Sequence, residues 1–303
     1  MTSIADSAFQ WKSNITSVFI PSGVTSIGGY AFYDCTALSS VVFGAGSKLE
    51  NIGDRAFQNC HILASIEIPA SVTSIGEWAF VNCNSLASID IPAGVISIGD
   101  GAFYRCDSLA SIEIPASVTS IGSYAFQNCH ILASIEIPAS VTSIGEEAFR
   151  DCNSLASIDI PAGVTSIGYA TFYGCNSLAS IDIPAGVTSI GKYAFYNCSS
   201  LVSIDIPAGV TSIGYRAFYG CSSLVSIEIP ASVTEIDDYA FCGCSGLKTI
   251  IMNGVTPPSL RSYSYAFDYT PSDMKIYVPS GSEAAYKSAS GWSYYKNKIT
   301  AKA

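Results

Sequence analysis

Apolar and polar positions alternate along this chain in one short pattern that is copied many times. Ten full copies fit the template I-P-A-[SG]-V-T-S-I-G-x-x-A-F-x-x-C-x-S-L-x-S-I-[DE]-I. The period is 23 residues, and nine cysteines mark it: Cys60, Cys83, Cys106, Cys129, Cys152, Cys175, Cys198, Cys221 and Cys244. Self-similarity at a fixed period of about 20 to 50 residues is the signature of a solenoid or a propeller. The pattern therefore predicts one continuous stack of coils.

Each copy contains two segments that favour extended structure. In L-A-S-I-D-I the isoleucines alternate with serine and a carboxylate, which is the period-two pattern of a half-buried strand. The proline that follows ends this strand, because proline cannot donate to a ladder. The segment V-T-S-I-G is β-branched and short, and it predicts a second strand or an extended turn closed by glycine. Coils of this kind stack at a strand spacing of about 4.8 Å.

The remaining segment, x-x-A-F-x-x-C, predicts one helical or 3₁₀ turn whose Ala, Phe and Cys side chains point inward. The residue just before each cysteine of the repeat is Asn, Asp or Gly, with Arg105 as the exception. These residue types tolerate a left-handed backbone. We therefore expect every coil to turn a corner immediately before its cysteine.

The repeat closely resembles the BspA-like, or Treponema pallidum-type, leucine-rich repeat over residues 1 to about 279. The segment Y-V-P-S-G-S-E-A-A-Y-K-S-A-S-G-W also resembles the C-terminal end common in that family. The resemblance implies an α/β repeat solenoid, a right-handed leucine-rich-repeat superhelix of short parallel strands with short helical or 3₁₀ turns. It also implies a bacterial cell-surface or secreted protein. Some members of the family are implicated in adhesion to host matrix or to other cells. The motif consists of core and turn residues, so it specifies the fold far better than the function.

Two segments are expected along the chain. Residues 1–252 form the solenoid, with one partial and ten full repeats, and residues 253–303 form a degenerate last repeat and a C-terminal cap. Ser282 is expected to cap a short helix over residues 284–289, with Gly291 as its stop signal. We expect Trp292, Tyr294 and Tyr295 to cover the last coil. Met1 stands where other copies have valine, so we expect this chain to be a piece of a longer protein.

Composition narrows the range of partners. Apolar residues make up 49% of the chain and charged residues 13%, which suits a long buried core. No apolar run approaches the length of about 18 residues that a membrane helix needs. The chain has 24 acidic and 14 basic residues and a net charge of -10, which argues against binding to nucleic acid phosphates.

The acidic excess is concentrated at one repeat position. Eight carboxylates occupy it: Glu67, Asp90, Glu113, Glu136, Asp159, Asp182, Asp205 and Glu228. Stacked like charges repel, so water, salt, cations or a basic partner must screen them. The simplest interpretation is a solvated strand face that keeps the solenoid soluble, with weak Ca²⁺ binding or docking of a basic partner as alternatives. A retaining glycosidase pair is conceivable at a spacing of about 5 Å, but equivalent carboxylates single out no acid and no nucleophile.

The turn positions on either side of Ala-Phe vary between copies, whereas the core positions hardly change. They hold the second set of candidate contact residues: Trp78, Tyr124, Tyr173, Tyr193, Tyr196 and Tyr219. Tyrosine, tryptophan and arginine are enriched at binding hot spots. The alternative is that each ring shields the edge of a neighbouring coil and keeps its hydroxyl in water.

Cysteine and histidine offer little chemistry. We expect the cysteines to be reduced thiols that pack as small hydrophobes, with disulfides or a metal site as minor alternatives. Cys242 stands where other copies mostly have Tyr or Gln, so we expect it to be exposed and oxidisable. His61 and His130 lie three coils apart, roughly 14 Å, and can share neither a metal ion nor a catalytic triad.

The sequence thus predicts a non-enzymatic scaffold for binding or adhesion to a protein or cell-surface ligand. A carbohydrate-binding or glycan-processing surface protein is the second hypothesis, and a purely structural spacer is the third. We expect no cofactor, no catalytic residues, no nucleic acid partner and no membrane span.

Overall fold

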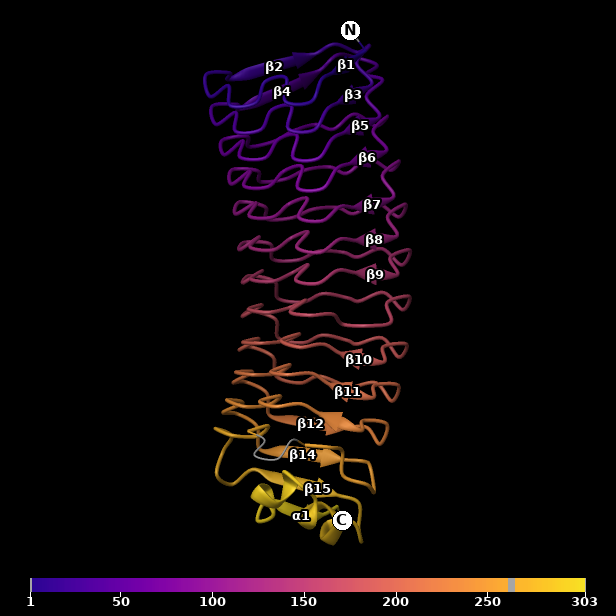
Figure 1. The fold of residues 1–303 in the computed structure, drawn as a ribbon, viewed down its shortest axis with the longest axis vertical. Coiled ribbons are helices and arrows are strands. Elements are labelled where there is room, and N and C mark those ends of the chain that lie inside the picture. Colours follow the sequence, from indigo (N-terminus) through magenta and orange to yellow (C-terminus); the bar gives the residue numbers. More distant parts are fainter. Residues whose placement is uncertain (1, 261–264, 303) are drawn as a thin grey trace. The chain divides into compact units, whose positions relative to one another are not determined.

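The computed structural model describes residues 2–260 and 265–302, and the chain divides into two compact units, Met1–Leu155 and Ala156–Ala303. Within each unit the coils lie one above another, and each coil carries one copy of the repeat (Figure 1). Every strand pairing among the described residues is parallel. The structure is therefore a parallel-strand solenoid in both units.

The first unit contains nine short strands in three sheets, ordered β1-β3-β5-β6, β2-β4 and β7-β8-β9. Their bounds are β1 Ser3–Ile4, β2 Ser17–Ile20, β3 Ser26–Ile27, β4 Ser40–Phe43, β5 Asn51–Ile52, β6 Ser74–Ile75, β7 Ser97–Ile98, β8 Ser120–Ile121 and β9 Ser143–Ile144. The register follows the repeat, since Ser120 pairs with Ser97 and with Ser143.

The second unit contains the other strands and the helices, with sheets ordered β10-β11-β13 and β12-β14-β15-β16. Their bounds are β10 Ser189–Ile190, β11 Ser212–Ile213, β12 Ser226–Ile229, β13 Glu235–Ile236, β14 Thr249–Met252, β15 Lys275–Val278, α1 Glu283–Ser288, η1 (a 3₁₀ helix) Trp292–Tyr295 and β16 Ile299–Ala301. In Figure 1, α1 lies beside β15 at the C-terminal end of this unit.

The two predicted extended segments differ in regularity. The V-T-S-I-G segment forms a short strand in most coils, from β3 to β13. The S-I-[DE]-I segment forms a full strand only near the ends, as in β2, β4 and β12, and elsewhere pairs through single bridges such as Asp90 with Glu113. Proline follows this segment directly and has no N–H to extend the ladder. The predicted sheet of S-I-[DE]-I strands is thus present but interrupted.

The predicted helical or 3₁₀ turn is absent from the x-x-A-F-x-x-C segments of the described residues, which form hydrogen-bonded turns instead. The residue before each cysteine of the repeat has a positive φ, for example 60° at Asp34 and 76° at Gly243. This confirms the predicted corner. A second left-handed residue, directly before Ala-Phe, interrupts any helix; examples are Arg55 (56°), Trp78 (58°) and Tyr124 (60°). The helical part of the α/β description is therefore not confirmed, and helix among residues 2–260 and 265–302 is limited to α1 and η1.

These left-handed residues aim alternate N–H groups at the next coil. Arg55 N donates to Glu77 O at 2.9 Å, and Asn59 N donates to Val81 O at 2.8 Å. A left-handed conformation costs a non-glycine residue about 1 to 2 kcal/mol, and a hydrogen bond returns about 1 kcal/mol. The turns are thereby tied to one another along the stack, and their side chains are held at fixed positions on the surface.

The core of each unit is a column of stacked phenylalanines. Phe57 and Phe80 are fully buried and their ring centroids lie 5.5 Å apart, with planes 5° from parallel. The repeat cysteines lie beside this column, and their thiols donate to a phenylalanine carbonyl in an earlier coil, as Cys83 Sγ does to Phe57 O at 3.2 Å. All cysteines are buried and free, which agrees with the expected reduced thiols. Burial raises the pKa of Cys83 to about 12.

The expectation for Cys242 was wrong, because this thiol is only 2% exposed. Its position in the repeat holds a half-buried ring in Tyr196 and Tyr219, but a short side chain there stays below the surface. Val81 occupies the same repeat position in the first unit and is likewise only 3% exposed. Burial also raises the pKa of the Cys242 thiol, so it is a poor nucleophile.

The C-terminal segment packs against the last coil of the second unit. Trp292 and Tyr295 pack on Phe267, with ring centroids at 5.7 and 5.1 Å, whereas Tyr294 is exposed. Trp292 Nε1 donates to Pro258 O at 2.7 Å, and the Tyr286 hydroxyl donates to Gly254 O at 2.8 Å. The predicted helix is present as α1, but no Ser282 side-chain hydrogen bond caps it. Gly291, with φ 77°, lies between α1 and η1.

Candidate functional site

The predicted carboxylates are on the surface in both units, since all eight are exposed. In the first unit, single parallel bridges join Asp90 to Glu113 and Glu113 to Glu136, and these residues line a shallow groove of about 380 Å³. In the second unit, Asp159 pairs with Asp182 in the same way. No ion pair among the described residues involves this row. Its charge is therefore left to solvent, ions or a partner.

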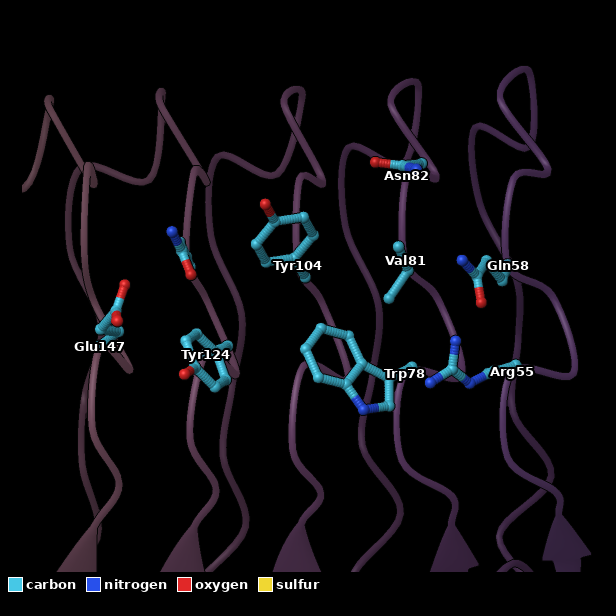
Figure 2. Close-up of a pocket in the computed structure, with 9 residues that line it drawn as sticks. Arg55, Gln58, Trp78, Val81, Asn82, Tyr104, Tyr124 and Glu147 are labelled. Carbon is cyan, nitrogen blue, oxygen red and sulfur yellow. The ribbon is translucent and has the colours of Figure 1, made fainter.

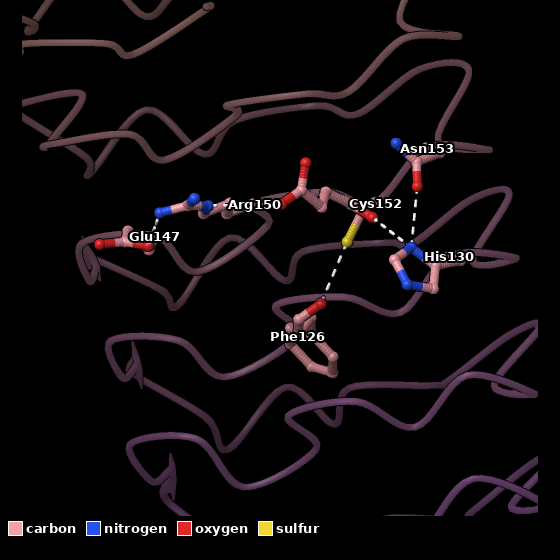
Figure 3. Close-up of polar contacts among 7 residues, drawn as sticks. Phe126, His130, Glu147, Arg150, Cys152 and Asn153 are labelled. Carbon is pink, nitrogen blue, oxygen red and sulfur yellow. Dashed lines mark hydrogen bonds and ion pairs between the residues drawn. The ribbon is translucent and has the colours of Figure 1, made fainter. Parts of the chain in front are cut away.

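Among the described residues, no group of three His, Cys, Asp or Glu side chains is arranged so that it could hold a metal ion. The two histidines make local contacts instead. His61 Nδ1 lies 2.8 Å from Asn84 Oδ1, and His130 Nδ1 lies 2.8 Å from Asn153 Oδ1 (Figure 3). Both partners are carbonyl oxygens, so each Nδ1 carries the proton and donates. The histidines thus join successive coils through amide side chains.

Two columns of side chains run along the turns of each unit. The first turn column holds the left-handed residue before Ala-Phe, and the second turn column holds the residue directly after Phe. The first turn column includes Tyr30, Arg55, Trp78, Gly101, Tyr124 and Glu147 in one unit and Ala170, Tyr193, Arg216 and Tyr239 in the other. The second turn column includes Tyr33, Gln58, Val81, Tyr104, Gln127 and Arg150 in one unit and Tyr173, Tyr196, Tyr219 and Cys242 in the other. Together we call them the turn face.

In the second unit, part of the turn face is a ladder of aromatic rings. Tyr196 stacks on Tyr173 at 4.6 Å and on Tyr219 at 4.9 Å, with ring planes 6° from parallel in both pairs. The guanidinium of Arg216 lies 5.3 Å from the ring of Tyr219 and 5.0 Å from that of Tyr239. Partial burial raises the pKa of the Tyr196 hydroxyl. The four tyrosines predicted here, Tyr173, Tyr193, Tyr196 and Tyr219, therefore form one half-buried surface.

In the first unit the turn face is hollowed into a cleft of about 510 Å³. Figure 2 shows Arg55, Trp78, Tyr124 and Glu147 in one row, with Val81 and Tyr104 in the row beside it. The Trp78 ring lies 5.8 Å from both Tyr124 and Tyr104, and the Arg55 guanidinium lies 5.7 Å from it. The cleft is lined by Arg55, Gln58, Trp78, Val81, Asn82, Tyr104, Tyr124, Gln127 and Glu147.

The structure thus separates the two predicted sets of contact residues. Trp78 and Tyr124 line the cleft, whereas Asp90, Glu113 and Glu136 line the shallow groove and share no lining residue with it. The sequence did not single out Gln58, Asn82 or Gln127. The signal was present, because Gly101, Val81 and Arg105 depart from the residue types that other copies have at these turn positions.

Comparison with known proteins agrees with this geometry. A family model described as the BspA type leucine rich repeat region, in six copies, matches residues 2–133, 119–248 and 166–290. The chain belongs to this family. The resemblance noted in the repeat template of the BspA-type chain is thereby confirmed. A search of curated proteins found no match to it.

Solved structures resemble the BspA-type chain over most of its length. A leucine rich cell surface protein from Faecalibacterium prausnitzii is 34% identical with a TM-score of 0.60, and the match covers 96% of this chain and 86% of that one. A leucine-rich repeat protein from Bacteroides ovatus is 29% identical with a TM-score of 0.69, over 100% and 88%. The T. pallidum leucine rich repeat protein is 35% identical with a TM-score of 0.51, over 53% and 78%. The leucine-rich-repeat fold of the BspA-type chain is confirmed.

Proposed function

We propose that the protein is a non-enzymatic binding scaffold whose turn face contacts a protein or cell-surface ligand. The tyrosine ladder of the second unit is the observation that carries this proposal. Large aromatic rings lose little conformational freedom on binding, and Tyr196 is already fixed between two stacked neighbours. Such a surface is organised before any ligand arrives, which lowers the entropic cost of association.

The cell surface is the proposed location. The relative from Faecalibacterium prausnitzii is described as a cell surface protein, and it is similar to this chain over almost all of its length. None of the helices in the described residues has the length and hydrophobicity to cross a membrane. We also infer the right-handed superhelix of the family, and the division into a repeat region, 1–252, and a cap, 253–303, stays a prediction.

The carboxylate row is the second proposed contact face. Its members are exposed and make no ion pair among the described residues, so a basic partner or weakly bound Ca²⁺ would gain attraction there. One member, Glu228, already accepts a hydrogen bond from Asn253 Nδ2 at 2.7 Å. The row provides no basis for catalysis, because a glycosidase needs one acid and one nucleophile in different environments. The carboxylates of this row share one repeat environment.

The two faces are separated by paired variants of the second unit. One triple variant changes Tyr193, Tyr196 and Tyr219 to Ala, and the other changes Asp159, Asp182 and Asp205 to Asn. We expect the tyrosine variant to lose binding to purified extracellular-matrix proteins and to cells, and the asparagine variant to keep it. The reverse result would move the contact to the carboxylate row. No binding by the wild type in either assay would leave the chain as a structural spacer.

A further inference from the structure

The cleft of the first unit exists because two successive copies carry unusually small residues. Gly101 has no side chain in the first turn column, and a methyl group there would collide with the six-membered ring of Trp78. Trp78 therefore lies in the space that Gly101 leaves. It meets Tyr124 at 5.8 Å although two coils separate them, a distance of roughly 10 Å along the stack. Val81 is the small residue of the second turn column and forms the floor.

Three amide side chains of the cleft have polar atoms without a hydrogen-bond partner. Gln127 is only 8% exposed, and its amide makes no hydrogen bond with any described residue. The Oε1 atom of Gln58 is fully buried and has no partner. A fully buried polar atom left unpaired, as Gln58 Oε1 is, costs about 1 to 3 kcal/mol, whereas the Gln127 amide is not fully enclosed and lines the cleft. Groups of this kind in a cleft favour a ligand that can satisfy them.

The third amide belongs to a ladder that stops at the cleft. Asn59 Nδ2 donates to Asp34 Oδ1, and Asn82 Nδ2 donates to Asn59 Oδ1 at 2.8 Å. The next copy has Arg105 at this position, so no amide continues the ladder. The Oδ1 atom of Asn82 accepts no hydrogen bond from any other described residue. In Figure 2 it points away from Gln58, toward the side of Tyr104.

We propose that this cleft binds a short oligosaccharide. A sugar hydroxyl both donates and accepts, so it can pair with the acceptor of Asn82 and with either atom of the Gln127 amide. The rings of Trp78, Tyr104 and Tyr124 offer apolar surface to the C–H face of a pyranose. This inference names a ligand class for one part of the turn face, and it therefore rests on the proposed binding function.

The dimensions and charges of the cleft agree with an elongated, mostly neutral ligand. Its lining comes from five successive copies, Arg55 to Glu147, which span about 19 Å at the strand spacing. Its volume of about 510 Å³ falls within the range of ligand sites, about 300 to 1,000 Å³. Glu147 is ion-paired to Arg150 at 2.6 Å (Figure 3), so the acidic end is neutralised. Arg55 has no ion pair among the described residues, and its guanidinium would donate to the carboxylate of an acidic sugar at that end of the cleft.

The test is calorimetric titration of the whole chain with linear hexasaccharides of glucose, mannose, N-acetylglucosamine and galacturonic acid. Val81→Tyr fills the cleft with a residue that the second turn column already accommodates at Tyr104, so this variant should fold. Trp78→Ala and Gln127→Ala remove cleft contacts. Tyr269→Ala is the matched control, because Tyr269 is an exposed ring that belongs to neither turn column.

We expect the wild type to bind at least one hexasaccharide. Val81→Tyr and Trp78→Ala should each weaken that binding about tenfold or more, Gln127→Ala about threefold or more, and Tyr269→Ala less than about twofold. Absence of binding by the wild type, or equal binding by Val81→Tyr, would overturn the inference. The same holds if unstructured peptides bind in the cleft and sugars do not.

The cleft and the tyrosine ladder can fail independently. If cells are bound through Tyr196 while no sugar binds, the cleft inference fails and the proposed function stands. If sugar binds at the cleft while the tyrosine ladder has no ligand, the cleft inference stands and the proposed contact through the ladder fails.

Discussion

Replacing Phe195 with alanine tests the arrangement of inward and outward columns on which every surface in this protein depends. Phe195 is 0% exposed and stacks on Phe172 at 5.5 Å and on Phe218 at 5.3 Å. Its backbone N donates to Ala217 O at 2.7 Å, and Phe172 N donates to Ala194 O at 2.9 Å, so the coils on both sides are held and cannot collapse fully into the space. A buried Phe→Ala change costs about 3 to 5 kcal/mol. Two lost stacking contacts, each worth about 0.5 to 1.5 kcal/mol, place this site in the upper part of that range.

Tyr196 provides the comparison because it is the next residue and also stacks on two neighbours. Its ring is half-buried, and the space left by Tyr196→Ala is open to water rather than enclosed. We expect this change to cost about 1 kcal/mol, the order of the stacking contacts alone. The difference between the two variants should therefore be about 3 to 4 kcal/mol.

Urea denaturation followed by circular dichroism gives the global loss for each variant. Repeat proteins unfold with limited cooperativity, since each coil contacts only its neighbours. Amide hydrogen exchange at Ala194, Ala217 and their flanking residues should therefore accompany the denaturation curves. Equal losses for Phe195→Ala and Tyr196→Ala would mean that the assignment of the two columns is wrong, and the proposed turn face would fall with it.

Three further predictions concern the thiols and the cap. Burial raises the pKa of the Cys83 thiol from 9.0 to about 12. Its stabilising contribution is therefore complete below about pH 8.5 and is lost as the pH rises toward 12. The free energy of unfolding from urea titrations should be lower at pH 9.5 than at pH 7.5, by about 1 kcal/mol for each such thiol. Cys242 should react with a disulfide reagent only after denaturation, and rapid labelling of the native protein would contradict its burial. Trp292→Phe removes the hydrogen bond to Pro258 and should cost about 1 to 3 kcal/mol, measured as a lower melting temperature and faster exchange confined to the second unit.

Prediction from sequence worked where a residue type has one structural meaning. Asn59 and Gly243 each form a left-handed corner, as their residue types predicted, because few other residues accept that backbone conformation readily. The other left-handed position could not be found in this way. Arg55, Trp78 and Tyr124 are poor residues for a positive φ, and the hydrogen bonds between coils, which are long-range contacts, impose it on them.

The candidate contact residues were predicted as two sets, but their environments were not. Spacing alone placed Tyr173, Tyr196 and Tyr219 in one column, and the structure stacks them. Spacing could not show that Cys242, in that same column, is buried, because exposure there depends on side-chain length. Nor could spacing show the cleft. The cleft depends on the Trp78 ring, which lies in the space left by Gly101 in the next coil, and on the small side chain of Val81.

In a protein made of copies, the positions that are copied faithfully cannot distinguish one coil from the next. A ligand bound only by those positions would slide along the stack in steps of about 4.8 Å with no change in energy. Specific binding at one place therefore requires departures from the repeat. Gly101, Val81 and Arg105 are three such departures within two successive copies, and each affects the same cleft. Gly101 leaves the space that the Trp78 ring occupies, Val81 is a small lining residue, and Arg105 ends the amide ladder at Asn82. If Gly101→Ala left sugar binding unchanged while Trp78→Ala abolished it, the ring would act alone and this clustering of departures would have no role in recognition.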